Sequence, residues 1–363
     1  MKLSIKTVVL QEMVGKAVKG ASQNKLIPLT SLMAIQLKKK TLTLITTDAS
    51  NYLYIVQDKV TGSDFYVVVY VDQFSKLISK LTSENVTLEL EDNTLNVTAN
   101  GNYKIELPLD ENGELIKYPN PIDGMKFEGD GYSVNLATIK TILNTNKASL
   151  AITMEEPEYT GYYVGDKVVS TDTFKICGLN VKLFDEPVLI APTTMNLLDV
   201  MTSDKISVFV QEDTLIFKTD NCIVYGHKME GIEDYAIEAI NGLLDEEFGS
   251  SCKVSRNDML ALLDRIALFV GPYDNKAINL TFTEEGIDIS SKQSNGIETI
   301  KYLESNNFKP YTCKLDITMF TEQVKSNESE HINLQYGNES SVKMVDGNVT
   351  QVVALLNEEQ VAE

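Results

Sequence analysis

Apolar and polar residues follow one another in a fixed order along this chain, and that order occurs three times. Each copy opens with a short strand that runs into an amphipathic helix, whose apolar residues lie three and four positions apart. These segments are residues 3–21, 132–149 and 252–270. In the first segment, six apolar residues share one helical face: Leu10, Met13, Val14, Ala17, Val18 and Ala21.

The remainder of each copy also follows one pattern. A hairpin of two alternating runs comes next, at residues 34–48, 162–172 and 278–292. After a further strand comes a second helix, at residues 71–81, 192–201 and 316–325. The predicted N-caps of these helices are Asp72, Thr193 or Thr194, and Asp316. Alternating strands close each copy, at residues 86–109, 206–229 and 332–356.

Residues 118–124 and 239–247 are rich in turn-forming and polar residues, so they predict the joints between the copies. We therefore predict three domains, at residues 1–122, 123–242 and 243–363. The two helices of each domain need an apolar surface to cover, and the antiparallel strands provide it. The predicted fold class is α+β, with three repeated two-layer domains.

Thr47-Asp48 ends a hairpin strand, and an acid at such a place can be a general base or a turn residue. The pair recurs as Thr171-Asp172, and Ser290-Ser291 stands there in the third copy. A residue that keeps its place in a repeat is more often part of the scaffold than a catalyst. We predict a side-chain-to-backbone bond that ends the strand.

Composition excludes several classes of protein. No run approaches the ~20 apolar residues of a membrane span, and Gln11 and Glu12 interrupt the only early apolar run, so we expect a cytoplasmic protein with no membrane partner. Four scattered cysteines and two histidines predict neither a disulfide framework nor a zinc site. Phosphate-binding loops, nucleophile elbows and metal-spaced carboxylates are absent, so we expect no enzyme activity and no cofactor.

KLIPLTSLMAIQL and LTLITTD in the first copy, with VVSTDTFKICGL in the second, resemble the bacterial sliding clamp family, the β subunit of DNA polymerase III. The resemblance follows the whole chain in order and spacing. It implies the DNA clamp fold, in which two chains join head to tail as a ring of six domains around duplex DNA. It also implies a non-catalytic processivity factor that tethers a replicative polymerase. Divergence from the family pattern and Lys-rich, Arg-poor usage suggest a phage or another mobile element as the source.

The formal charge of −20 argues against nucleic-acid binding, because phosphate contacts need Lys and Arg. The six predicted helices nevertheless sum to +2, while the three predicted domains carry 0, −10 and −10. Screening over ~8 Å lets lysines near DNA outweigh a distant acidic surface. The predicted DNA-binding residues, with Lys25 added by the resemblance, are Lys16, Lys19, Lys25, Lys76, Lys80, Lys140, Lys147 and Arg265. Their contacts would be to phosphate and independent of sequence. The alternative is an ordinary solvated helix face.

The resemblance further implies that polymerase and clamp loader bind through short peptides with hydrophobic anchors, in a groove between the second and third domains. By position, it assigns this pocket to Tyr159, Thr171, Thr173, Phe174, Lys175, Ile176, Ile240, Val352, Ala354 and Leu356. The chain departs from the family at Thr173-Phe174-Lys175, where Gly-His-Arg is usual, and in the extension formed by residues 357–363. The alternative is an inter-domain core that binds nothing.

For the homodimer, the resemblance places Leu268 and Phe269 of one chain against Tyr103 and Ile105 of the other. The alternative for Phe269 is an ordinary core position, because residues 260–270 are apolar almost all round. A rival function remains at this stage. The chain can instead be a clamp-like scaffold or decoy that binds clamp-interacting peptides without encircling DNA.

Overall fold

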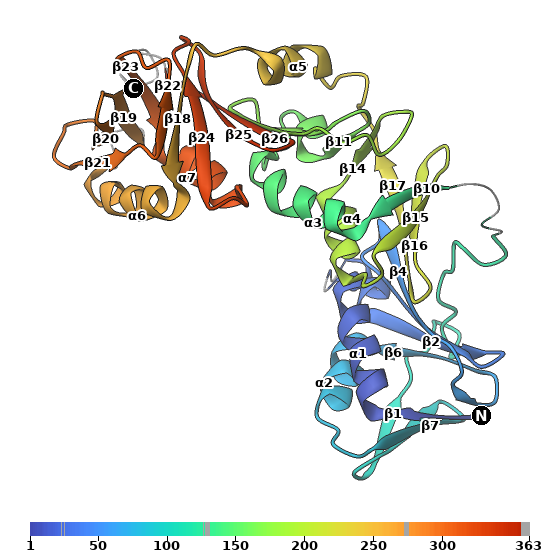
Figure 1. The fold of residues 1–363 in the computed structure, drawn as a ribbon. Helices are drawn as coiled ribbons and strands as arrows, with labels where there is room; N and C mark the ends of the chain where they lie inside the picture. The colour runs from blue at the N-terminus through green and yellow to red at the C-terminus, as the bar shows by residue number, and fades with distance from the viewer. Residues whose placement is uncertain (23, 25, 126, 128–130, 272–275, 357–363) are drawn as a thin grey trace. The chain divides into compact units, whose positions relative to one another are not determined.

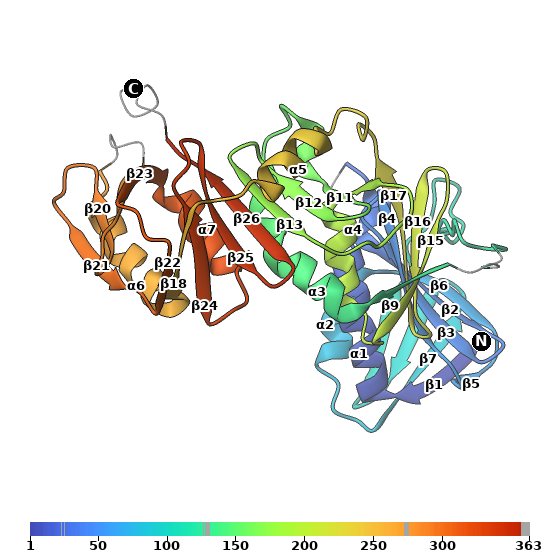
Figure 2. The same ribbon diagram turned by 45° about the horizontal axis from the view of Figure 1, so that its top comes forward.

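The threefold order of elements is present in the computed structural model, which describes residues 1–22, 24, 26–125, 127, 131–271 and 276–356. Each copy runs β-α-β-β-β-β-α-β-β-β (Figures 1 and 2). The first copy consists of β1 (Lys2–Lys6), α1 (Thr7–Ala17), β2 (Leu32–Lys38), β3 (Thr41–Thr47), β4 (Asn51–Gln57), β6 (Phe65–Tyr70), α2 (Val71–Ser79), β7 (Asn85–Glu91), β8 (Thr94–Thr98) and β9 (Asn102–Glu106), with a short β5 (Thr61–Gly62) before β6.

The other two copies repeat this order. The second consists of β10 (Tyr132–Asn135), α3 (Leu136–Thr145), β11 (Tyr162–Val164), β12 (Val168–Thr171), β13 (Lys175–Leu179), β14 (Val188–Ile190), α4 (Pro192–Leu197), β15 (Lys205–Val210), β16 (Thr214–Lys218) and β17 (Cys222–Met229). The third consists of β18 (Ser250–Ser255), α6 (Arg256–Ile266), β19 (Ala277–Phe282), β20 (Gly286–Ser291), β21 (Ile297–Lys301), β22 (Glu304–Asn306), β23 (Tyr311–Asp316), α7 (Ile317–Ser326), β24 (His331–Tyr336), β25 (Ser341–Asp346) and β26 (Val349–Ala354). A further helix, α5 (Ile237–Asp245), lies between these copies in the sequence.

Strands of each copy form two antiparallel groups. In the first copy, β1-β7-β8-β9 is one group and β6-β2-β3-β4 the other. The second copy repeats them as β10-β15-β16-β17 and β14-β11-β12-β13. The third copy repeats them as β18-β24-β25-β26 and β23-β19-β20-β21. Three copies therefore share one topology, although their sequences differ.

Successive copies are joined by strand pairing. β4 of the first copy pairs antiparallel with β17 of the second, with Asn51 opposite Gly226. β13 of the second copy pairs in the same way with β26 of the third, with Lys175 opposite Val353. Both joints therefore use the hairpin strand of one copy and the last strand of the next. We call them the first joint and the second joint.

Two compact units divide the chain, one formed by residues 1–139 and 193–228, the other by residues 140–192 and 229–363. The first joint lies inside the first unit and the second joint inside the second unit. Each unit is described below by itself. The domain boundaries predicted at residues 122/123 and 242/243 divide the chain differently and stay a prediction.

Helices cover one face of the strands and close the cores. In the first unit α1 and α2 pack together, and Leu10, Phe74 and Ile78 are fully buried beneath them. In the second unit α6 and α7 pack together over a cluster that includes Met259, Phe320 and Leu334. Burial of one such side chain contributes roughly 1.5–3 kcal/mol, so these faces account for the amphipathic pattern of the sequence.

Four details differ from the sequence-based expectation. The helices are shorter than predicted, because several end in a single 3₁₀ turn, as at Val18–Gly20. Residues 239–247, predicted as a polar joint, mostly belong to α5. The predicted N-caps also differ. Asp72 lies inside α2 and pairs with Lys76 instead of capping the helix.

Thr193 and Thr194 lie inside α4, where their hydroxyls bond to Asn51. Only the Asp316 prediction is confirmed, since its carboxylate accepts from Thr318 and Met319.

Replacing Asp316 with alanine is expected to lower the free energy of unfolding by about 1 kcal/mol, because α7 loses a side-chain cap. Asp72→Ala is the matched control, and it should cost no more than about 0.5 kcal/mol, the value of an exposed ion pair four residues apart on a helix. Urea unfolding followed by circular dichroism measures both changes. Equal losses would contradict the capping difference between the two aspartates.

Candidate functional site

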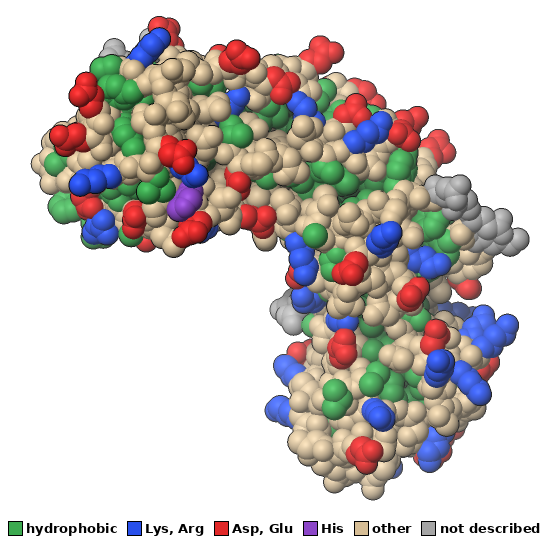
Figure 3. All heavy atoms as spheres, in the orientation of Figure 1, with side chains coloured by type: hydrophobic (Ala, Val, Ile, Leu, Met, Phe, Trp, Pro, Cys, Tyr) green, Lys and Arg blue, Asp and Glu red, His purple; other side chains and the backbone are tan. Residues whose placement is uncertain are grey.

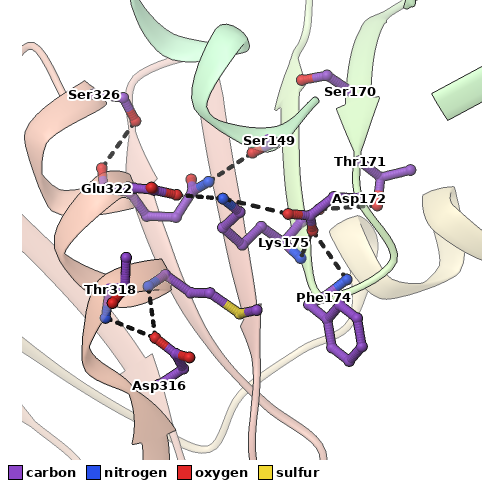
Figure 4. A network of polar contacts seen from close by, with 12 residues as sticks. Ser149, Ser170, Thr171, Asp172, Phe174, Lys175, Asp316, Thr318, Glu322 and Ser326 are labelled. Atoms are coloured by element: carbon purple, nitrogen blue, oxygen red, sulfur yellow. Dashed lines mark hydrogen bonds and ion pairs between the residues drawn. The ribbon is translucent and has the colours of Figure 1, made fainter. Parts of the chain in front are cut away.

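Two copies of one five-residue turn stand at the joints, at residues 47–51 and 171–175. Thr171 donates its hydroxyl to the Lys175 carbonyl at 2.8 Å and accepts from the Thr173 amide at 3.0 Å. Asp172 accepts from the amides of Phe174 and Lys175, at 3.1 and 2.7 Å (Figure 4). These bonds satisfy the backbone where the chain reverses, so the prediction of a scaffold role for the Thr-Asp pair is confirmed.

The first joint repeats this geometry bond for bond. Thr47 donates to the Asn51 carbonyl at 2.5 Å and accepts from the Ala49 amide at 3.0 Å, while Asp48 accepts from Ser50 and Asn51 at 2.9 and 2.7 Å. The third residue of each turn has a left-handed backbone, with φ of 87° at Ala49 and 73° at Thr173. The third copy has a longer turn, in which the Gly296 amide donates to the Ser291 hydroxyl.

The last residue of each turn ties its joint to a helix of the next copy. Asn51 donates its amide to Thr193 at 3.2 Å, and Thr194 donates to the Asn51 side-chain oxygen at 2.6 Å. Lys175 instead places its ammonium between Asp172 and Glu322, on α7 (Figure 4). Its side chain is only 7% exposed, so this cation is screened little by solvent. The first joint is therefore tied to its helix by neutral groups, and the second by an ion pair with a buried cation.

Further polar contacts fix α7 at the second joint. Gln323 donates to the Ser149 hydroxyl at 2.6 Å, and Asn144 of α3 donates to Glu328 at 2.6 Å. Arg256 donates to the carbonyls of Val324 and Lys325 at the C-terminal end of α7. The dipole of a helix favours a positive charge at that end. The strand pairing of the second joint is thus reinforced from the helix side.

An apolar cluster lies on the other face of the second joint, and we call it the partner face. It consists of Tyr159, Val169, Ile176, Leu189, Tyr235, Ile240, Leu244 and Val352. Four of the ten predicted pocket residues are therefore brought together: Tyr159, Ile176, Ile240 and Val352. Ile176 and Val352 lie directly opposite each other across the strand pair.

The other predicted pocket residues lie at the edge of this face or beyond it. Thr171, Thr173 and Lys175 form the turn, and Phe174 is half-exposed at its tip. The Phe174 carbonyl accepts from the Ala354 amide at 2.9 Å, so the end of β26 lies beside the turn. Leu356 follows β26, and its amide donates to the Lys314 carbonyl. The extension at residues 357–363 lies outside the described residues.

Sequence reasoning missed the contribution of α5 to this face. Ile237, Ile240 and Leu244 recur at spacings of three and four, which is a helical pattern, although the acidic residues nearby made the segment look like a loop. Tyr235 was missed as well, and burial raises its pKa. Its ring lies 5.0 Å from Tyr159 and 5.1 Å from Tyr163. The partner face is consequently filled by aromatic and aliphatic side chains.

Seven of the eight predicted DNA-binding residues are described by the structure, and these seven lie on or beside helices. Four of them are paired with carboxylates. Lys16 pairs with Glu12 at 2.7 Å, Lys76 with Asp72 at 2.7 Å and Lys19 with Asp199 at 3.5 Å. Arg265 makes two bonds to Glu298, at 2.8 and 2.6 Å, which raise the pKa of Arg265 and lower that of Glu298. Lys25 lies outside the described residues. Because these cations are paired with carboxylates, they attract DNA phosphates less strongly than the number of basic residues suggested.

Three predicted cations remain available. Lys80, Lys140 and Lys147 are exposed, and none forms an ion pair within the part of the chain that the structure describes. In Figure 3, Lys and Arg side chains are frequent over the body that holds β1, β2 and α2, whereas Asp and Glu line the edge beside α5. The acidic excess thus lies outside the first copy, as the predicted domain charges of 0, −10 and −10 indicated.

Two of the predicted dimer residues lie on an edge strand, and the other two lie in the 3₁₀ turn Ala267–Phe269 after α6. Tyr103 and Ile105 lie on β9, which pairs on one side with β8. The Ile105 side chain is buried in its own copy, so only its backbone N–H and C=O groups are available for pairing at this edge. Leu268 is 82% exposed, while the Phe269 ring packs at the Gly296 backbone, where β21 begins. β21 pairs on one side with β20.

Other site chemistry is limited in the described ranges. They contain no group of three or more His, Cys, Asp and Glu placed to hold a metal ion. None of their helices is long and apolar enough to cross a membrane. All four cysteines are buried, and burial raises their pKa values to about 12. Thiolate chemistry at neutral pH is therefore disfavoured at each of them.

Asp172→Asn is expected to lower the free energy of unfolding by about 1–2 kcal/mol, because it removes a charge from a buried ammonium while it keeps the acceptor oxygen of the turn. The matched Asp48→Asn faces only neutral partners and loses one bond, from the Asn51 side-chain amide, so it should cost less, about 0.5–1 kcal/mol. Thermal and urea unfolding of both variants test the difference. A larger loss for Asp48→Asn would contradict the ionic character assigned to the second joint.

Comparisons with known proteins agree with this architecture. Residues 1–119 match the family model described as DNA polymerase III beta subunit, N-terminal domain. A search of curated proteins found no match. Among solved structures, the Bacillus subtilis DNA polymerase sliding clamp is 17% identical with a TM-score of 0.84, covering 98% of this chain and 99% of that one. The Streptococcus pyogenes beta subunit is 16% identical with a TM-score of 0.85, covering 98% and 100%. The chain therefore has the fold of the bacterial sliding clamps along nearly its whole length, and its first third matches the model of their N-terminal domain.

Proposed function

We propose that this protein is a DNA sliding clamp: a homodimer that encircles duplex DNA without reading its sequence and tethers a replicative polymerase. One observation carries the proposal. Both joints within the chain are built the same way, and the threefold repeat leaves one hairpin strand, β21, and one final strand, β9, each with a single strand partner. A second copy of the chain can supply the missing partner to both edges.

The repeat also predicts the register of this third joint. Asn51 lies opposite Gly226 and Lys175 opposite Val353, and the matching positions in the third and first copies are Gly296 and Ile105. Ile297 of one chain would then face Lys104 of the other. Since each chain carries one of each edge, two chains satisfy both edges and close head to tail, as heterologous interfaces do when the rotation closes.

The proposed domains are residues 1–122, 123–242 and 243–363. Polymerase and clamp loader would bind at the partner face through short peptides with apolar anchors, since its apolar cluster with a polar turn at its edge suits such a ligand. Such a clamp works in the cytoplasm, where the chromosome or an infecting genome is copied. A closed ring cannot leave circular DNA, so a tether of this kind needs only weak contacts to phosphate. The three unpaired lysines among the predicted residues, Lys80, Lys140 and Lys147, can supply such contacts.

Closure around DNA can be tested without a loader. We expect the double variant Lys104→Cys with Ile297→Cys, mixed with circular plasmid and then oxidised, to form a covalent dimer that stays on the plasmid in 1 M NaCl. The native cysteines are buried and should not interfere. Cutting the plasmid once should release the protein, because a ring slides off a free end. Gel filtration with light scattering gives the oligomeric state.

Two controls accompany this experiment. Each single cysteine variant should give no covalent dimer, and Lys104→Cys with Leu303→Cys, whose leucine lies two residues past the end of β21, should cross-link poorly. Retention that survives linearisation, or a monomer that never cross-links, would contradict the clamp. A monomer that still binds polymerase peptides would favour the decoy.

Among the predicted cations, the unpaired ones should matter most for DNA. We expect Lys80→Ala, Lys140→Ala and Lys147→Ala together to lower the affinity for a nicked duplex and to reduce the slope of log K against log salt by up to about 3, near 0.9 per phosphate contact. Lys16→Ala, Lys19→Ala and Lys76→Ala together should reduce it less, because carboxylates already neutralise those lysines. Salt titrations by fluorescence anisotropy compare the two sets. A steeper loss for the paired set would contradict this assignment.

A further inference from the structure

α5 lies across the strands that form the floor of the partner face. It packs against β13 and β26, and its side chains Ile240 and Leu244 belong to the same apolar cluster as Tyr159, Ile176 and Val352. Ile240 is 6% exposed and Leu244 is 5% exposed, so the strands and the helix exclude water between them. The surface on which a partner peptide would place its anchors is therefore already occupied by the chain itself.

The fit of Leu244 is close. A Cβ atom added at Gly178 of β13 would lie 2.7 Å from one Leu244 methyl carbon, nearer than such atoms approach in proteins. The absence of a side chain at Gly178 thus leaves the recess that Leu244 fills. Ile240 and Leu244 are four residues apart on α5. This is the spacing of the anchors with which an amphipathic helix binds a groove on another protein.

α5 itself is a weak helix. It has nine residues, contains Gly242, and begins without a side-chain cap at Ala236. A helix this short is marginal in water, and an internal glycine costs about 1 kcal/mol relative to alanine. Its last turn carries Asp245 and no basic residue, which opposes the helix dipole. Its position therefore depends on what holds it to the sheet.

A buried cation on β25 supplies that hold. Lys343 donates to the Leu244 carbonyl at 2.8 Å and to the Glu246 carbonyl, and so places a positive charge at the end of α5. Burial lowers the pKa of Lys343, while Asp245, Glu246 and Glu247 oppose that shift. Asp245 also pairs with Lys167, and Glu246 accepts from Asn338. Apart from these contacts at one end, the helix is anchored by the buried side chains of Ile240 and Leu244 and by the partly buried Ile237.

Among the described residues, the first joint has no such helix. There the connection after β9 crosses the equivalent face as an irregular segment, fixed by Tyr118, whose hydroxyl donates to the Leu32 carbonyl at 3.1 Å. Tyr54 donates to Asn120 in the same region at 3.0 Å. A helix held mainly by apolar side chains is thus a property of the second joint, where the partner peptide would bind.

We propose that α5 is a displaceable strap, which occupies the partner face in the free protein and must move aside before a peptide with apolar anchors can bind there. This inference rests on the proposed function, since it concerns the same binding face. Peptide anchors and the side chains of Ile240 and Leu244 compete for one space, so the two states exclude each other. The apparent affinity for peptide is then the intrinsic affinity multiplied by the fraction of molecules with α5 displaced.

The strap and a fixed pocket wall predict changes of opposite sign. If α5 is a strap, Ile240→Ala and Leu244→Ala weaken its hold and should raise the affinity for peptide about tenfold each, through a larger displaced fraction. If α5 is a permanent part of the pocket, the same substitutions remove contacts and lower the affinity. The probe is a fluorescein-labelled nonapeptide with adjacent leucine and phenylalanine anchors, and anisotropy with the full chain gives the affinity.

Leu243→Ala is the matched control. It removes the same atoms from the same helix, but Leu243 is 40% exposed and lies outside the apolar cluster. Its affinity for the probe should stay within about twofold of the unchanged chain. Lowered or unchanged affinity in the Ile240 and Leu244 variants, with peptide bound by the unchanged chain, would overturn the strap while leaving the clamp proposal intact.

Hydrogen exchange of the unchanged chain gives a second measurement, which does not depend on whether a variant folds. Adding the probe should speed exchange of the amides of residues 237–245 if α5 is released, and slow it if α5 lines the pocket. Failure of the probe to bind the unchanged chain and both variants would remove the peptide site and the strap together. Retention on circular DNA would still decide the clamp function by itself.

Discussion

Antiparallel pairing of a hairpin strand with the last strand of the next copy is the constraint on which this structure depends. It occurs twice within the chain, as β4 with β17 and as β13 with β26, and both times a Thr-Asp turn sets the start of the hairpin strand. A one-residue slip would turn every side chain of the strand to the opposite face, so the turn also fixes which residues reach the partner face. The same pairing, used between chains, would allow the proposed dimer to close.

The two joints differ in the chemistry of one position. The Asn51 side-chain amide bonds to Asp48 of its own turn and to two threonines of α4, whereas the Lys175 ammonium pairs with carboxylates of its own turn and of α7. A buried ion pair contributes little net stability compared with apolar packing, but loss of one partner is costly, so it favours a single arrangement. At the second joint this fixes the turn and Phe174 beside the face where α5 now lies.

The charge distribution would suit the proposed tether more than a tight binder of DNA. Carboxylates neutralise Lys16, Lys19, Lys76 and Arg265, and the acidic excess belongs to the later two thirds of the sequence. A protein that relies on topology has no need of strong phosphate contacts, and weak ones let it slide. Both arginines are committed to contacts within the protein, which leaves no arginine free to read bases.

The sequence by itself determined the elements and their threefold order. Apolar spacing of 3.6 and 2 residues is a local property, and the recurrence of Thr47-Asp48 as Thr171-Asp172 was enough to predict a turn whose bonds span five residues. Tertiary structure alone decided which side chains that are distant in the sequence contact one another. The pairing of Lys16 with Glu12 was open to sequence reasoning, but Arg265 with Glu298 and Lys175 with Glu322 join residues 33 and 147 positions apart. The place of α5 on the partner face likewise follows from a recess at Gly178 and a cation at Lys343, and folding brings both to the helix from distant strands.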